Sequence, residues 1–323
     1  MDAKQKKKLI WQLPFLTLLV VGSILIIRQQ RSAPYQHHEG LVFGTFYSVT
    51  YQSEENLQSA IEAELKKVDD EFSMFNEHST TSRINRGEQP QRSAMFNEVF
   101  DLAQTVHGET DGAFDITVAP LVNAWGFGFK HEQMPTSQQV DSLLKIRNQY
   151  DFSAIAKGYG TDVVARLLRS RGIQNFMVEI GGEVVTQGIS QRRLPWKIGV
   201  TKPTDDSLSV GGELQTVLNI TDMAMATSGN YRNFYYKGGR KYAHTIDPKT
   251  GYPVQHSLLS ATVLAKSCAV ADAYATAFMV MGVERAKAVL DRHPALMAYF
   301  IYANPDGSNG VWFSPALKDK ISE

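Results

Sequence analysis

A carboxylate and a hydroxyl stand one helical turn apart in a segment that is otherwise small and apolar. The segment is SCAVADAYATAFMVMG, residues 267–282, and the two groups belong to Asp272 and Thr276. Side chains four residues apart lie on the same face of a helix. A buried carboxylate is costly without a partner, and Mg²⁺ takes carboxylate and other oxygen ligands. The pair indicates either a metal site or an Asp cap followed by a Thr bonded to its own backbone.

A second candidate is the small-residue turn AIAKGYG at residues 154–160, which leads into the start of a helix. Free N–H groups and the positive end of the helix dipole suit a phosphate there, and Lys157 adds a cation. The spacing is not that of a P-loop, and Gly181-Gly182 does not complete a dinucleotide-binding glycine pattern. An ordinary tight loop stays open as the alternative, as does a bulge or close packing site at Gly181-Gly182.

Two polar, turn-rich stretches carry groups that could move a proton or bind a phosphate. They are ATSGNYRNFY at 226–235 and HTIDPKTGYP at 244–253, and they contain Ser228, His244 and Asp247. Either stretch could be a plain surface loop, and a lone histidine is more often structural. The single cysteine, Cys268, excludes an intrachain disulfide and a cysteine-based zinc site.

The elements that must position these groups are helices and strands without a strict βαβ order, which predicts an α+β fold with substantial antiparallel sheet. Strands are expected over 41–51 and within 175–188, 196–203, 215–222, 258–267 and 296–302. Helices are expected from Ser53, over 93–107, in the second half of 151–172 and over 267–282. A hairpin is expected over 235–247, turning at Gly238-Gly239.

Composition limits the class of partner. Lysine plus arginine and aspartate plus glutamate number 33 each, so no whole-chain basic field indicates nucleic acid. With 43 % apolar and 20 % charged residues, the chain has the balance of an ordinary globular protein.

The N-terminus differs from the rest of the chain. Lysines within residues 1–8 precede an uncharged run at 9–27, which is long enough for the core of a bilayer. The positive charge before the run predicts that residues 1–8 stay in the cytoplasm and that the body of the protein crosses. An uncleaved signal anchor is favoured over a cleaved signal peptide, because no small-residue cleavage site follows. Residues 28–40 are then expected to form a polar tether and residues 41–323 a single domain.

Taken together, the chain resembles the FAD:protein FMN transferases of the ApbE family. The resemblance rests on eight segments in the family's order: FGTFYSV, FSMFNEHSTTSRIN, DGAFDITVAPLVNAWGFG, DFSAIAKGYGTD, VEIGGEVVTQG, ATSGNYRNFY, HTIDPKTGYPV and SCAVADAYATAFMVMG. It implies one catalytic domain with a mixed or antiparallel sheet and packed helices. It also implies Mg²⁺-dependent transfer of FMN from FAD to a threonine or serine hydroxyl of a target protein, with AMP as the leaving group.

The resemblance assigns roles to individual residues. The metal ligands fall on Asp272, Thr276 and the main-chain oxygen of Ala154. The FAD contacts fall on Phe43, Phe75, Ala113, Phe114, Asp115, Asp151, Lys157, Ser228 and Ile246. His244 is the expected base at the transfer site, with Asp247 as an orienting or alternative base. Phe43 stands where the family usually has Met, and Phe75 stands where it commonly has Tyr. Both replacements keep apolar surface, but Phe75 lacks the tyrosine hydroxyl.

The implied partners are FAD, the membrane and target flavoprotein subunits of membrane redox complexes, such as sodium-pumping quinone reductases. The implied location is the bacterial inner membrane, with the catalytic domain on the periplasmic side. Two alternatives stay open: a hydrolase that splits FAD into FMN and AMP with water, and a membrane-tethered carrier that binds FAD without chemistry.

Overall fold

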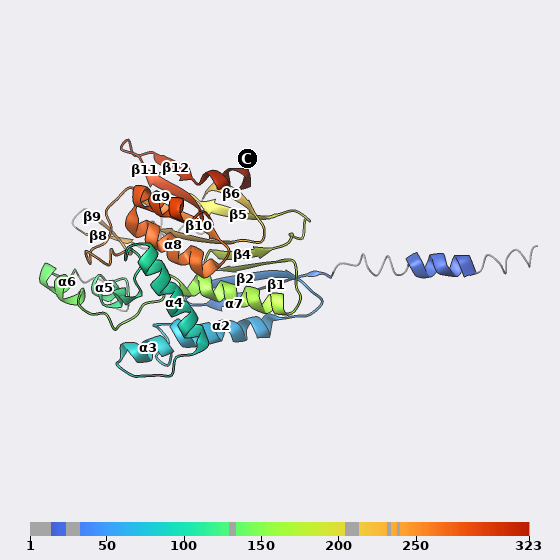
Figure 1. Cartoon of the computed structure of the whole chain (residues 1–323), viewed down its shortest axis with the longest axis horizontal. Helices are drawn as coiled ribbons and strands as arrows, with labels where there is room; N and C mark the ends of the chain where they lie inside the picture. The colour runs from blue at the N-terminus through green and yellow to red at the C-terminus, as the bar shows by residue number, and fades with distance from the viewer. Residues whose placement is uncertain are drawn as a thin grey trace, which may run out of the picture.

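An eight-stranded antiparallel sheet runs through the chain, in the order β1-β2-β3-β4-β7-β10-β11-β12 (Figure 1). The computed structural model describes residues 14–23, 33–128, 134–203, 213–230, 234–237 and 240–322. The strands of the large sheet are β1 (Tyr35–Val42), β2 (Thr45–Gln52), β3 (Phe176–Ile180), β4 (Glu183–Gln187), β7 (Ala224–Gly229), β10 (Leu258–Ala265), β11 (Met297–Ala303) and β12 (Asn309–Phe313). The predicted α+β class with antiparallel sheet is therefore confirmed.

Two tight hairpins shape the half of the sheet that starts at β1. Phe43 and Gly44 join β1 to β2 with φ angles of 51° and 73°, and Gly181 and Gly182 join β3 to β4 with φ angles of 62° and 102°. Two-residue turns with positive φ match the twist of paired strands. Gly181-Gly182 is thus a hairpin turn and not a bulge. Residues 35–40, expected to be tether, pair with β2 as part of β1.

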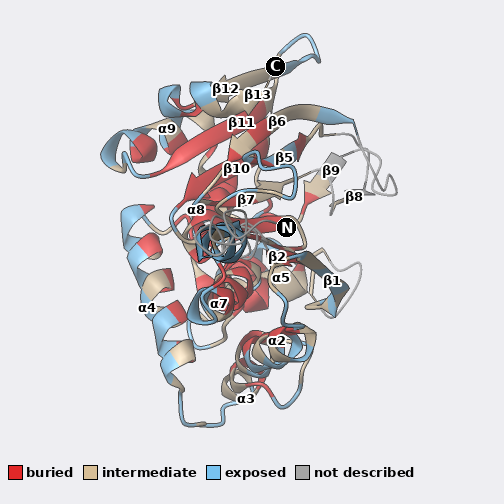
Figure 2. Ribbon diagram, turned by 90° about the vertical axis from the view of Figure 1, so that its right-hand side faces the viewer, coloured by how far each residue is buried: buried red, intermediate tan, exposed pale blue. Residues whose placement is uncertain are grey.

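Helices cover one face of the large sheet. The longer helices are α2 (Gln58–Phe72), α4 (Ala94–Glu109), α7 (Ala156–Ser170), α8 (Cys268–Met281) and α9 (Val283–Arg292), and the shorter ones are α3 (Thr80–Asn85), η1 (Ile116–Val118), α5 (Ala119–Ala124) and α6 (Ser137–Leu143). Helix α7 packs on β3 and β4, α8 packs on β7 and β10, and the two helices contact each other. Burial is concentrated in α7, α8 and the strands behind them (Figure 2).

A smaller sheet packs on the opposite face. It consists of β5 (Trp196–Thr201), β6 (Leu214–Ile220) and β13 (Ile321–Ser322). The helix η2 (Pro315–Lys320) directly precedes β13 in the chain and contacts β6. The apolar side chains of the smaller sheet share a core with β7, β10 and β11. The strands β8 (Phe234–Lys237) and β9 (Arg240–Ala243) form the expected hairpin, whose turn at 238–239 lies outside the described residues.

The N-terminal prediction falls largely outside the described residues. Of the expected span 9–27, residues 14–23 are described and are helical. Within the part of the chain that the structure describes, no helix has both the length and the apolar character needed to cross a bilayer. The predicted transmembrane helix therefore finds no support in the structure.

Candidate functional site

The start of α8 is held by a carboxylate from another helix. Asp162 of α7 accepts the backbone N–H groups of Cys268 and Ala269, each over 2.9 Å, and the hydroxyl of Ser267 over 2.7 Å. Burial raises the pKa of Asp162 above its ordinary value, and these hydrogen bonds oppose that shift. Asp162 and Ser267 thus supply the cap, so the alternative in which Asp272 caps α8 is wrong.

Asp272 points across to the first turn of α7. Its Oδ2 accepts the backbone N–H of Gly158 over 3.0 Å, and the residue is only 2 % exposed. The N-cap residue of α7, Ile155, makes no side-chain cap hydrogen bond, so the Asp272 carboxylate satisfies one of the free N–H groups at the helix start. Burial raises the pKa of Asp272, while the nearby Lys157 charge lowers it. A Cβ on Gly158 would lie 2.4 Å from the Cys268 carbonyl oxygen, so this approach of the two helices requires glycine.

Thr276 lies one turn further along α8 and faces the sheet. Its hydroxyl is 3.1 Å from the hydroxyl of Ser228 in β7. Ser228 belongs to the strand β7, although the sequence around it is rich in turn-forming residues. The α8–β7 contact brings these two predicted site residues together.

Oxygen ligands for a metal ion are available around this junction. Between described residues, no backbone N–H donates to the Ala154 carbonyl, because the N–H of Gly158, its partner in a regular helix, donates to Asp272. Among the described residues no three His, Cys, Asp or Glu side chains converge on one position. The predicted ligands are one carboxylate, one hydroxyl and one carbonyl, which are donors of the kind that a hard divalent cation completed by phosphate or water oxygens accepts.

Lys157 forms a partly buried ion pair with Glu183, beside Asp272. Its Nζ lies 2.6 Å from Oε1 of Glu183, whose side chain is 3 % exposed. Burial alone would lower the pKa of Lys157, but the charges of Asp272 and Glu183 hold it above the ordinary value. Burial raises the pKa of Glu183 to about 7, although the Lys157 charge lowers it. The lysine therefore stays cationic.

Lys157 also lines a cavity of about 380 Å³ with strongly apolar walls. The aromatic residues on its wall are Phe43, Phe72 and Phe75, and the polar ones include Ser73, Asn76, Asp151 and Ser153. Phe75 is 75 % exposed, whereas Asp151 is buried, accepts the Ser153 N–H over 2.8 Å and has a pKa raised by that burial. Four predicted contacts, Phe43, Phe75, Asp151 and Lys157, thus share one cavity, which offers both aromatic surface and an ammonium group.

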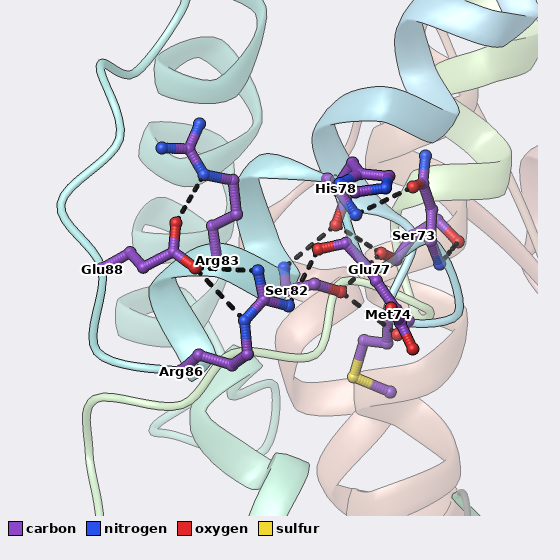
Figure 3. Close-up of polar contacts among 10 residues, drawn as sticks. Ser73, Met74, Glu77, His78, Ser82, Arg83, Arg86 and Glu88 are labelled. Atoms are coloured by element: carbon purple, nitrogen blue, oxygen red, sulfur yellow. Dashed lines mark hydrogen bonds and ion pairs between the residues drawn. The ribbon is translucent and has the colours of Figure 1, made fainter.

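The loop that carries Phe75 is fixed by α3 (Figure 3). The hydroxyl groups of Ser79 and Ser82 donate to the Ser73 carbonyl over 2.5 and 3.2 Å, and Arg86 donates to the Glu77 carbonyl over 2.8 Å. These contacts hold the loop 73–77, which includes the cavity-lining residues 73–76, against α3. The serine-rich sequence after Phe75 therefore positions a wall of the cavity.

The other predicted contacts lie away from this cavity. Ala113 and Phe114 are buried, and Asp115 lines a second cavity of about 530 Å³ together with Arg147, whose Nη1 is 2.9 Å from its carboxylate. The segments of the two cavities meet where the Asp151 N–H donates to the Ile116 carbonyl over 2.7 Å.

The HTIDPKTG segment forms a tight turn. Ile246 pairs with Pro253, and the carboxylate of Asp247 accepts the Lys249 N–H over 2.8 Å. The ring of His244 lies 6.4 Å from that of Phe127, centroid to centroid.

The family model of the ApbE family matches residues 43–300 of this chain. The chain belongs to the ApbE family. Curated relatives named FAD:protein FMN transferase include one from Vibrio cholerae serotype O1, 36 % identical over 87 % of this chain and 92 % of the relative. Another, from Escherichia coli K12, is 32 % identical over 93 % of this chain and 95 % of the relative.

Solved ApbE structures have the same fold. The flavin transferase ApbE from Vibrio cholerae matches with a TM-score of 0.79 and 35 % identity, covering 89 % of this chain and 99 % of that one. The apo form of the Pseudomonas stutzeri flavinyl transferase ApbE matches with a TM-score of 0.78 and 29 % identity, covering 90 % and 98 %. The match spans nearly the full ApbE domain.

Sequence reasoning missed two charged residues of this ApbE site, Asp162 and Glu183. Each is an isolated acid next to an apolar pair, in GTDVV and GGEVV. An acid at such a position is costly unless it is paired, and that pattern is the signal that could have found both.

Proposed function

We propose that this chain is a Mg²⁺-dependent FAD:protein FMN transferase, which links FMN through a phosphoester to a threonine or serine of a target protein and releases AMP. The observation that carries the proposal is the contact between Asp272 and the start of α7, because it holds a buried carboxylate against the first turn of the helix whose Lys157 lines an aromatic cavity. A planar flavin suits the aromatic surface of that cavity, and a diphosphate suits the ammonium group and the helix N-terminus.

Each group has a part in this reaction. Phe43 and Phe75 offer apolar surface to the flavin, and the Lys157 ammonium donates to the diphosphate. The carboxylate of Asp272, the hydroxyl of Thr276 and the carbonyl of Ala154 would hold the Mg²⁺ ion. When bound, the ion supplies positive charge that stabilises the developing charge on the bridging oxygens. Catalysis of this kind is mostly positioning and electrostatics.

The attacking hydroxyl needs to lose a proton. We assign His244 as the base, because a histidine side chain can accept a proton near neutral pH. Asp247 is the alternative, although its carboxylate already accepts the Lys249 N–H within the turn.

The partners and location are part of the same proposal. The acceptors are flavoprotein subunits of membrane redox complexes, of the sodium-pumping quinone reductase kind. Residues 9–27 anchor the chain in the bacterial inner membrane, and the domain faces the periplasm. The lysines before that uncharged run support this orientation.

The test combines purified protein, FAD, MgCl₂ and the flavin-accepting subunit of a sodium-pumping quinone reductase. Mass spectrometry should find FMN on one acceptor threonine or serine, with AMP in solution and no product when EDTA replaces Mg²⁺. Free FMN with unmodified acceptor would show a hydrolase, and intact FAD would show a carrier; either result refutes transfer. Asp272→Asn should abolish the product, whereas Asp141→Asn on the exposed face of α6 should not.

A further inference from the structure

We propose that Glu183 is a positioning residue, which holds the Lys157 ammonium where the substrate diphosphate must lie. The inference rests on the proposed function and adds to it a residue that contacts Lys157, not the substrate. It is carried by the partly buried ion pair between the two side chains, with 2.6 Å between Nζ and Oε1.

The hairpin between β3 and β4 is built to place this carboxylate. Glu183 is the first residue of β4, directly after the Gly181-Gly182 turn. Gly181 has a φ of +62°, and a Cβ there would lie 2.9 Å from Thr45 Cγ2 and 3.3 Å from Oε2 of Glu183. Glycine is therefore needed for the backbone conformation and leaves space for the acid. The backbone of Glu183 is therefore held in place by the sheet, whereas Lys157 is carried by helix α7.

Lysine needs such a partner if it is to act at one point. Its ammonium group is a compact charge on a flexible four-carbon chain, so it does not set its own direction. The Lys157 side chain is 31 % exposed and lines the cavity, whereas the Glu183 side chain is 3 % exposed. The carboxylate thus holds the ammonium group from the buried side, while the lysine side chain lines the cavity.

The arrangement of buried charges supports a role beyond folding. Oε2 of Glu183 is buried and has no hydrogen-bond partner among the described residues, so the carboxylate is not there to complete a local network. A buried acid with an unsatisfied oxygen costs stability. Asp272 and Glu183 together also place two carboxyl groups beside one ammonium group, an arrangement that suits a site for a divalent cation and a diphosphate.

The experiment is a double-mutant cycle on the full-length protein with FAD, MgCl₂ and the same acceptor subunit. Its variants are Glu183→Gln, Lys157→Met and the double variant, with Glu183→Asp as the conservative change. We expect Glu183→Gln to lower kcat about tenfold to hundredfold, with a smaller change in KM for FAD, because a misplaced group loses mainly transition-state stabilisation. Glu183→Asp should recover part of the rate.

The decisive measurement is the effect of Glu183→Gln when Lys157 is already absent. If Glu183 acts through Lys157, the change should then alter kcat by less than about twofold. The proposal would be overturned if Glu183→Gln lowered kcat by the same factor in the wild type and in Lys157→Met. A Glu183→Gln protein with wild-type kcat would also overturn it. If the Glu183→Gln protein does not unfold cooperatively on heating, Glu183→Asp replaces it. The effect of Glu183→Asp on kcat is then compared between the protein with Lys157 and the Lys157→Met variant, and the same criterion applies. Absence of transfer by the wild type would instead refute the proposed function.

Discussion

The backbone N–H of Gly158 donates to the Asp272 carboxylate over 3.0 Å, although the two residues are 114 positions apart in the chain. This bond joins the first turn of α7 to the second turn of α8. It satisfies a helix-start N–H with a buried acid, and it leaves the Ala154 carbonyl without a backbone donor among the described residues. The spacing between the two helices, set by a glycine, therefore determines how closely the Asp272 carboxylate approaches the start of α7.

The first prediction concerns that spacing. In Gly158→Ala, the new Cβ would lie 2.4 Å from the Cys268 carbonyl oxygen and 2.8 Å from Asp272 Cβ, both of which are held in place by α8. We expect the helices to move apart, which should lower the free energy of unfolding by about 1–3 kcal/mol. The rate of FMN transfer should fall about a hundredfold. Urea denaturation and a transfer assay measure the two effects.

Gly108→Ala is the matched control. Gly108 lies near the end of α4, and nothing lies within 4 Å of the position that its Cβ would take. Alanine is the better helix former, so this variant should be stabilised by up to about 1 kcal/mol and keep its activity. Equal losses in both variants would show that the effect is not specific to the α7–α8 contact.

The sequence indicates which groups meet at this junction but not how they meet. Asp272 and Thr276 could be proposed as a pair because four-residue spacing in an apolar helix is visible in the chain itself. Glu183 was missed because its partner, Lys157, is 26 positions away and lies on a helix, whereas Glu183 lies on a strand. Such a pairing depends on tertiary packing, which no local pattern encodes.

The strands show the same division between local and non-local information. The hairpin β1–β2 was missed because its turn is Phe43-Gly44, and a phenylalanine with a φ of 51° is not a usual turn residue. The Asn-Gly or Gly-Gly pairs that normally announce such a turn are absent there. Gly181-Gly182 is such a pair, but the sequence allowed either a hairpin turn or a bulge there. Only the pairing of the flanking strands decides between a turn and a bulge.

A second prediction concerns the strained turn residue. Phe43 holds its positive φ while its ring lines the cavity and packs close to Gly160. Asparagine tolerates this backbone conformation, so Phe43→Asn should keep the hairpin but lose the aromatic surface. We expect the dissociation constant for FAD, measured by flavin fluorescence, to rise about tenfold. Phe46→Asn is the control, because Phe46 belongs to the same hairpin and is 72 % exposed; an equal effect of that change would count against the assignment of Phe43.

A third prediction separates the two candidate bases. His244→Ala should lower kcat about 10²- to 10⁴-fold at saturating FAD, with an unchanged dissociation constant for FAD. Asp247→Asn preserves a side-chain oxygen that can accept the Lys249 N–H, so it should keep both the turn and most of the rate. Stopped-flow transfer assays of the two variants measure the difference. If Asp247→Asn is the slow variant and His244→Ala the fast one, the base is Asp247.

The last prediction is a pH dependence of stability that arises at the far end of α8. The Nε2 of His256 lies 2.8 Å from the Met279 carbonyl, and the Leu258 N–H donates to its Nδ1 over 3.3 Å. This arrangement requires the neutral ring with the proton on Nε2. Burial lowers the pKa of His256 below its ordinary value of 6.5, and the hydrogen bond to Met279 opposes that shift only in part.

The sign follows from proton binding. Between the lowered pKa of the folded state and the ordinary value of 6.5, the unfolded chain binds the proton and the folded one does not. The contribution of His256 to stability is therefore present above pH 6.5 and is lost as the pH falls below that value. Thermal unfolding measured between about pH 7.5 and pH 5 should show a smaller decrease in midpoint for His256→Gln than for the wild type, because glutamine does not titrate. His78→Gln, at an exposed position on the loop of Figure 3, should leave the wild-type decrease unchanged, and an identical pH dependence of wild type and His256→Gln would contradict the assignment.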